Sequence, residues 1–168
     1  MVLLNRPDIR QDSEHEQTVV RFLMGVAWLV YILFIHADHA LAREVIIAPV
    51  LYLTTCFLIF SWIMINPGLH PCRGFTSMFL DTFFASYALI YLGKYGAPLF
   101  AAYLFLVFSY GFRYGNIYLY TSVMMCITGF SMVLVYSNGY WEEQRLLGYG
   151  IIIAIMVLAI YVSFLISR

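Results

Sequence analysis

Three ionisable side chains, Arg21, Asp81 and Arg113, stand within or at the end of long apolar stretches of this chain. A charge removed from water is costly, so a carboxylate in such a place pairs with a cation or takes up a proton. We therefore predict that Asp81 forms an ion pair with Arg113 or Arg21. Such a pair would either fix the packing of helices or act as a switch, in which a carboxylate-bearing amphiphile competes for the arginine.

The composition indicates the medium that surrounds these charges. Of the 168 residues, 63% are hydrophobic and 18% are aromatic, and the mean hydropathy is +0.85. A water-soluble domain of this composition would have too little polar surface to face water. A lipid bilayer requires every spanning backbone group to find its hydrogen bond within the span, which favours helices. The sequence therefore predicts an all-α, polytopic membrane protein folded as a helical bundle in a lipid bilayer.

The lengths of the apolar runs predict about six spans, because about 20 residues cross about 30 Å of hydrocarbon. Turn signals such as Asn66-Pro67-Gly68 and Gly96-Ala97-Pro98 separate consecutive spans. The fourth span is the shortest, and the count falls to five if it is tilted or interfacial. The predicted spans are, in chain order, residues 18–36, 46–65, 75–92, 98–112, 118–136 and 146–166.

The basic residues predict the orientation of these spans. With six spans both ends of the chain share one side of the membrane, and that side holds six of the nine lysines and arginines. Because basic residues are enriched in cytoplasmic loops, both termini are expected in the cytoplasm. Residues 1–17 then form a cytoplasmic juxtamembrane segment, and residues 18–168 form a transmembrane domain.

The neighbours of Asp81 predict which way its side chain faces. Ser77, Asp81, Ala85 and Ala88 recur at helical spacing along the third span. Small residues on one face of a membrane helix let a neighbouring helix approach closely. We therefore expect Asp81 to face the interior of the bundle.

The polar segment before the first span has the pattern of a helix start. Asp12 or Ser13 can cap a helix, and Glu16, three residues after Ser13, completes a capping box. The acidic Glu14 and Glu16 also suit the positive end of the helix dipole. The pattern predicts that the first helix begins at this cap, at the boundary between lipid headgroups and hydrocarbon.

Motifs typical of enzymes are not found in this sequence. It contains no glycine-rich phosphate loop, no nucleophile–base arrangement and no zinc-ligand spacing. We therefore expect no catalytic residue, no cofactor and no metal in this segment. The formal net charge of zero gives no reason to expect a nucleic-acid partner.

Two stretches carry a resemblance to a known family. Asp12-Ser13-Glu14-His15-Glu16-Gln17 resembles the juxtamembrane segment of RpfC-type sensor histidine kinases. Tyr110-Gly111-Phe112-Arg113-Tyr114-Gly115, followed by Tyr118-Leu119-Tyr120, resembles that family's Gly-Phe/Leu-Arg-Tyr-Gly and Tyr-Leu-Tyr pattern. Further matches fall in the same order along the chain: Asn66-Pro67-Gly68, Asp81, Ala97-Pro98-Leu99 and Tyr140-Trp141.

The resemblance implies a sensory input domain of a two-component system in the bacterial inner membrane. Proteins of this family detect the diffusible signal factor, a cis-2-unsaturated fatty acid used in quorum sensing. The family implies a homodimer, kinase modules after residue 168 and a response regulator as partner. Family members are often described with five spans, against the six predicted above.

The resemblance also implies where the fatty acid binds. The family's ligand-responsive juxtamembrane segment corresponds to Asp12, Ser13, Glu14, Glu16 and Gln17. We add as ligand-binding candidates the ionisable residues near the same side and the tyrosines beside Arg113, namely Arg21, Asp81, Arg113, Tyr110 and Tyr114.

Two other classes of function stay open on the sequence alone. A small transporter or channel would need polar groups on several helices and interrupted spans. A structural membrane anchor would need neither Asp81 nor Arg113. A lipophilic pocket lined by Arg113 would favour a receptor over both alternatives.

Overall fold

The computed structural model describes the backbone of residues 7–38, 43–66, 70–137 and 139–167, and the side chains of residues 14–36, 45–66, 70–137 and 139–167. Within these residues the chain divides into two compact units, Met1–Ser77 and Met78–Arg168. Helix α3 runs through the boundary between them, and each unit is described by itself.

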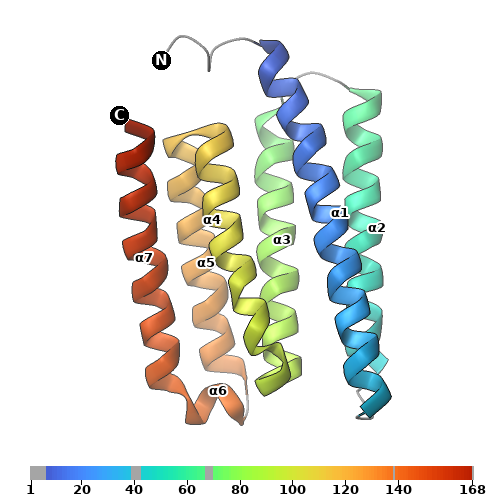
Figure 1. Cartoon of the computed structure of the whole chain (residues 1–168), viewed down its shortest axis with the longest axis vertical. Helices are drawn as coiled ribbons and strands as arrows, with labels where there is room; N and C mark the ends of the chain where they lie inside the picture. Colours follow the sequence, from blue (N-terminus) through green and yellow to red (C-terminus); the bar gives the residue numbers. More distant parts are fainter. Residues whose placement is uncertain (1–6, 39–42, 67–69, 138, 168) are drawn as a thin grey trace. The chain divides into compact units, whose positions relative to one another are not determined.

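The described residues fold into helices, and no strand occurs among them (Figure 1). The prediction of an all-α membrane helical bundle is confirmed. The elements, in chain order, are α1 (Pro7–Asp38), α2 (Arg43–Ile65), α3 (Pro71–Leu92), the 3₁₀ helix η2 (Gly93–Phe100), α4 (Ala101–Tyr114), α5 (Asn116–Tyr136), the short α6 (Tyr140–Glu143) and α7 (Arg145–Ser167).

Five helical stretches in the described part of the chain are long and apolar enough to cross a membrane, so this is a multi-pass membrane protein. They are Glu14–His36, Val45–Ile65, Pro71–Tyr114, Asn116–Tyr136 and Arg145–Ser167.

The third of these stretches is 44 residues long and consists of α3, η2 and α4. Figure 1 shows that the chain reverses direction at η2, so that α3 and α4 are separate limbs, as the sequence predicts. The turn begins at Gly93, whose φ of 53° is a conformation that residues with a Cβ rarely adopt. The 14 residues of α4 extend over about 21 Å. A complete crossing by this fourth limb therefore stays a prediction.

The start of α1 differs from the sequence-based expectation. The helix begins at Pro7, so Asp12 and Ser13 lie in its second turn rather than at its cap. Proline suits the first helical position because its fixed φ is helical and its missing N–H would have no partner there. The predicted capping box of Ser13 and Glu16 is therefore wrong.

In unit 1, α1 and α2 pack against each other in opposite directions (Figure 1). They approach closely at Gly25, where a Cβ would lie 2.7 Å from Leu53 and 3.0 Å from Tyr52. The rings of Trp28 and Tyr52 meet edge to face, with centroids 5.9 Å apart. Gly25 thus permits a close approach of α1 to α2, and the rings of Trp28 and Tyr52 pack next to it.

In unit 2, α4, α5 and α7 pack around a core that includes Tyr103, Phe130 and Ile155, all fully buried. The short α6 contributes Trp141, whose indole N–H donates to the carbonyl of Leu89 over 3.0 Å. This bond ties the α5–α7 connection to the end of α3.

The surface of the chain differs from that of a water-soluble protein, although its core is apolar as well. Large apolar residues such as Ile65, Val135 and Ile160 are more than 70% exposed. Hydroxyl-bearing residues such as Thr82 and Ser122 are buried instead. This distribution fits a chain whose outer surface contacts lipid, and it leaves polar groups to bond one another inside.

We predict that Gly129→Ala destabilises unit 2 by about 1–3 kcal/mol. A Cβ at Gly129 would lie 2.6 Å from Ser86 Oγ and 2.9 Å from Thr82 Cγ2, and Ser86 is held by two hydrogen bonds. Gly150→Ala in α7 is the matched control, because nothing lies within 4 Å of its added Cβ. Equilibrium unfolding in mixed micelles, followed by circular dichroism, measures both variants. Equal midpoints for the two would contradict this packing.

Candidate functional site

The face of α1 that is buried near the start of the first span is polar. Glu14, Gln17, Thr18 and Arg21 follow the spacing of a single helix face, and the last three are at most 5% exposed. Apolar side chains on another face of the same helix, such as Val19 at 55% and Leu23 at 63% exposure, point outward. The acidic segment singled out in the sequence therefore continues into the membrane as a buried polar stripe.

At the start of this stripe Glu14 forms an ion pair with Arg73 of α3. The guanidinium Nη2 contacts the Glu14 carboxylate, and Nη1 donates to the carbonyl oxygen of Asn66 over 2.9 Å. The side chain of Arg73 is 3% exposed and that of Glu14 is 11% exposed. Neither charge is well hydrated when it is buried in this way. The carboxylate therefore stabilises the guanidinium by compensating its charge.

Local sequence explains why Arg73 is placed to do this. The backbone N–H of Asn66 bonds to the carbonyl of Trp62 at the end of α2, and α3 begins at Pro71. Arg73, the third residue of α3, donates its backbone N–H to the carbonyl of His70. The end of α2 and the start of α3 thus give Arg73 both a fixed backbone and a carbonyl acceptor.

Sequence reasoning missed Arg73 as a site residue and counted it only as a basic residue on the cytoplasmic side. The available signal was its position: a cation close after Pro71, on the same predicted side of the membrane as Glu14. The pair spans 59 positions of the sequence, so no local pattern links its members.

In unit 2 Asp81 is 7% exposed, which confirms that it faces the interior. The hydroxyl of Tyr110 on α4 donates to Asp81 Oδ2 over 3.1 Å. One turn further along α3, Ser86 Oγ donates to the carbonyl of Thr82 and lies 2.7 Å from the hydroxyl of Tyr103. Since a serine has one hydroxyl proton, Tyr103 is the donor to Ser86.

These four side chains, Asp81, Ser86, Tyr103 and Tyr110, form what we call the α3–α4 ladder. Both tyrosines are fully buried. Because α3 and α4 run in opposite directions, Asp81 pairs with Tyr110, whereas Ser86, further along α3, pairs with the earlier Tyr103. These two pairings fix the register of the two helices. It brings together two predicted site residues, Asp81 and Tyr110.

The other predicted site residues have varied surroundings. Arg113 and Tyr114 are half-buried near the end of α4. The ring centroids of Tyr114 and Tyr110 lie 6.0 Å apart. Glu16 is exposed. The side chains of Asp12 and Ser13 lie outside the described residues. An ion pair of Asp81 with Arg113 or Arg21 stays a prediction.

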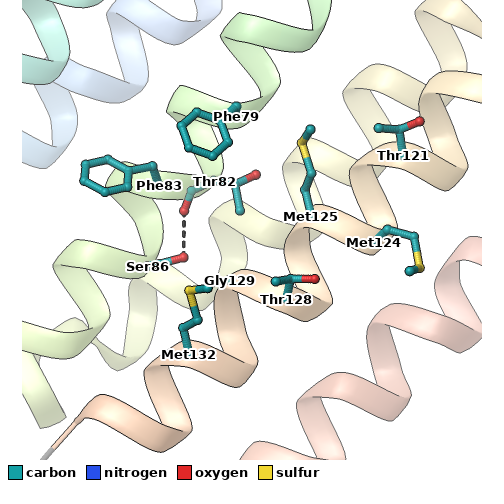
Figure 2. Close-up of a pocket in the computed structure, with 10 residues that line it drawn as sticks. All are labelled: Phe79, Thr82, Phe83, Ser86, Thr121, Met124, Met125, Thr128, Gly129 and Met132. Atoms are coloured by element: carbon teal, nitrogen blue, oxygen red, sulfur yellow. Dashed lines mark hydrogen bonds between the residues drawn. The ribbon is translucent and has the colours of Figure 1, made fainter.

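A groove of about 370 Å³ opens between α3 and α5 (Figure 2). Its lining is uncharged and includes Gly129 and Met132. The hydroxyls of Thr82 and Ser86 on its wall bond to backbone carbonyls of α3, so they offer little to a polar ligand. Arg113 lines neither this groove nor a second one beside Trp141, so the ligand pocket expected at Arg113 also stays a prediction.

Comparison with known proteins confirms the resemblance found in the sequence. The chain is similar to the sensory/regulatory protein RpfC from two strains of Xanthomonas campestris pv. campestris. Identity is 23% over 159 residues, which cover 90% of this chain and 21% of each relative. The chain thus spans about a fifth of the length of the curated relatives it matches. No family model and no solved structure matches it.

We predict that Tyr110→Phe lowers the free energy of unfolding by about 0.6 kcal/mol, the average for a hydrogen bond inside a membrane protein. The substitution keeps the ring in place and removes the hydroxyl that Asp81 accepts from. Tyr136→Phe is the control, because Tyr136 is 68% exposed. Unfolding in mixed micelles compares the two, and an equal effect would count against the bond to Asp81.

Proposed function

We propose that this chain is the membrane input module of a two-component sensor kinase that detects a cis-2-unsaturated fatty acid. The observation that carries the proposal is the similarity to sensory/regulatory proteins along 90% of the chain. It includes the membrane helices rather than a soluble part alone. On this proposal, the module sits in the bacterial inner membrane and acts as a homodimer.

The proposed signal is an amphiphile that partitions into the bilayer before it meets the protein. Each methylene that leaves water contributes about 0.8 kcal/mol to this partitioning. The carboxylate stays near the headgroups, at the depth where α1 enters the membrane. The polar stripe of α1 supports this role, because Gln17 and Arg21 lie near the start of an otherwise apolar span, on its buried face.

Transmission requires two arrangements of the helices and a ligand that prefers one of them. The buried pair of Glu14 with Arg73 supports this mechanism, because it ties α1 to α3 and an opened buried ion pair is costly. Kinase modules expected after residue 168 would receive the change through α7 and pass a phosphoryl group to a response regulator.

A thermal-shift titration with a series of cis-2-unsaturated fatty acids tests the proposal. The chain in nanodiscs should unfold at a higher temperature as the acid is added, because a ligand at 100 times its Kd stabilises by about 2.7 kcal/mol. The trans isomer and the methyl ester should shift the midpoint less. Glu16→Ala and Arg113→Ala should weaken the response if these predicted site residues contact the ligand.

Glu142→Ala serves as the control, since Glu142 is 58% exposed and pairs only loosely with Arg145 over 3.4 Å. An unchanged midpoint of the unsubstituted chain at saturating acid would overturn the proposal and favour a structural membrane anchor.

A further inference from the structure

A groove of about 650 Å³ opens in unit 2 between η2, α6 and α7. Its volume lies within the usual range of small-molecule sites, about 300–1,000 Å³. Part of its wall is a single face of α7, since Leu147, Ile151 and Ala154 follow helical spacing. Pro98 of η2 and Trp141 of α6 contribute to the rest of the lining. Three separate elements thus enclose a largely apolar space.

The groove remains open because nothing packs against Gly150 of α7. A Cβ placed there would meet no atom within 4 Å. Two residues earlier, Gly148 permits close packing instead, since its Cβ would lie 2.4 Å from Leu134 of α5. A small residue on a membrane helix usually lets a neighbouring helix approach. At Gly150 no described element does so, and the small Ala154, one turn further on, also lines the open space.

Lys94 is the one charged residue among the described residues that line the groove. Its side chain is exposed, and its ammonium nitrogen lies 5.0 Å from the centroid of the Tyr95 ring. Among the described residues no carboxylate forms an ion pair with Lys94: in α6, Glu142 pairs with Arg145, and Glu143 does not line the groove. A cation beside an apolar groove is complementary to an anion that carries an apolar tail.

The depth of the groove limits the length of that tail. The turn at η2 and the short α6 lie at the same end of unit 2 (Figure 1), where α7 begins at Arg145. The lining from Leu147 to Ala154 extends about 10 Å along the helix. The tail of a bilayer lipid crosses its leaflet, which is about 15 Å or half of the hydrocarbon core. The groove therefore suits a tail shorter than that of a bilayer lipid.

We propose that this groove binds the fatty-acid signal, with its carboxylate on Lys94 and its tail along the face of α7. The inference rests on the proposed function and deepens it by adding a site at the end of α3, whereas the polar stripe of α1 contacts the start of α3. On the orientation predicted from the basic residues, the end of α3 faces the outside of the cell. An acid that arrives from outside meets this groove first. The ligand class is a monocarboxylate with one medium-length apolar tail.

Binding in the groove acts on α7, the helix that leads toward the kinase modules expected after residue 168. An acid held by Lys94 of η2 and by the face of α7 bridges these two elements. Because the space at Gly150 is otherwise empty, the tail adds contacts to a side of α7 that has none there. The ligand thus favours the arrangement of helices in which η2 and α7 enclose it.

Trp141 provides a readout that is specific to this groove. The chain has three tryptophans, and Trp28 and Trp62 belong to α1 and α2. The variant Trp28→Phe/Trp62→Phe therefore leaves Trp141 as the only tryptophan. In zwitterionic nanodiscs, cis-2-decenoic acid that carries a bromine at mid-chain should quench its fluorescence saturably, because bromine quenches a tryptophan only at close range. The unbrominated acid should displace the brominated acid and restore the emission.

Three substitutions in this background test the two parts of the site. Lys94→Gln should raise the Kd for quenching about fivefold or more, because the charge-assisted bond is lost. Lys94→Arg should keep the Kd within about twofold, because arginine retains the charge. Gly150→Leu should raise the Kd about tenfold or more, because the new side chain occupies the space of the tail. Leucine favours a helix more than glycine does, so α7 should still form.

Two further substitutions serve as matched controls and should leave the Kd unchanged. Arg145→Gln removes an exposed cation from the same connection that does not line the groove. Val157→Phe adds bulk to α7 beyond the lining, at a residue that is 60% exposed. If the background variant does not fold, a thermal-shift titration compares Lys94→Gln with Arg145→Gln in the otherwise unsubstituted chain. Lys94→Gln should then respond more weakly, and equal responses would overturn the site.

The outcomes separate this inference from the proposed function. An unsubstituted chain whose unfolding temperature does not respond to the acid would overturn the proposed function. A chain that responds, but whose Trp141 is not quenched saturably, would overturn the groove alone, as would an unchanged Kd in Lys94→Gln or in Gly150→Leu.

Other occupants of the groove give different results. If added phosphatidylglycerol weakens binding to the Lys94 chain more than to Lys94→Gln, the groove belongs to a bilayer lipid. If Gly150→Leu converts a dimer into a monomer, the groove belongs to a second copy of the chain. Either result would overturn the assignment to the fatty acid.

Discussion

The ion pair between Glu14 and Arg73 is the interaction on which the account of this molecule depends. Two charges that are nearly excluded from solvent stay in place because each compensates the other. Removal of either partner alone from such a buried pair typically costs about 3–5 kcal/mol. The same pair ties the beginning of α1 to the beginning of α3 within one unit, so an electrostatic requirement holds these two helix starts together.

Elsewhere in the interior, buried polar side chains compensate each other by hydrogen bonds, and each bond contributes less free energy than a buried ion pair. In the α3–α4 ladder, a buried carboxylate and a buried hydroxyl each accept a bond from a tyrosine. Hydrogen bonds of this kind contribute only about 0.6 kcal/mol on average in membrane proteins, because the unfolded chain in lipid also finds partners. The ladder therefore specifies the register of α3 against α4 more than it stabilises the fold. Gly129 of α5 leaves room for Ser86 and so lets α5 lie close to the ladder.

Much of the architecture could be predicted from the sequence because the bilayer imposes strong constraints on it. Apolar run lengths and turn residues located the helices, including the reversal near Gly93 that separates α3 from α4. The stripe of small residues around Asp81 correctly predicted its burial. These are local or periodic signals, which a sequence displays directly.

The features that were missed depend on choices between competing local signals or on tertiary contacts. Ser13 with Glu16 has the pattern of a cap, but Pro7 begins the helix earlier and the cap is not used. The bond from Tyr110 to Asp81 was not foreseen, and a contact of Tyr110 with the ligand stays a prediction. Arg73 meets Glu14 only after α2 and α3 have folded back. A pairing of that kind has no spacing that a sequence could reveal.

A double-mutant cycle on the buried pair tests the central claim most directly. Free energies of unfolding are measured in mixed micelles for the unsubstituted chain, Glu14→Gln, Arg73→Gln and the double variant. We expect a coupling energy of at least about 1.5 kcal/mol, with the double variant less destabilised than the sum of the single variants. Additive effects, with a coupling energy below about 0.3 kcal/mol, would mean that the two charges do not depend on each other and would contradict the account.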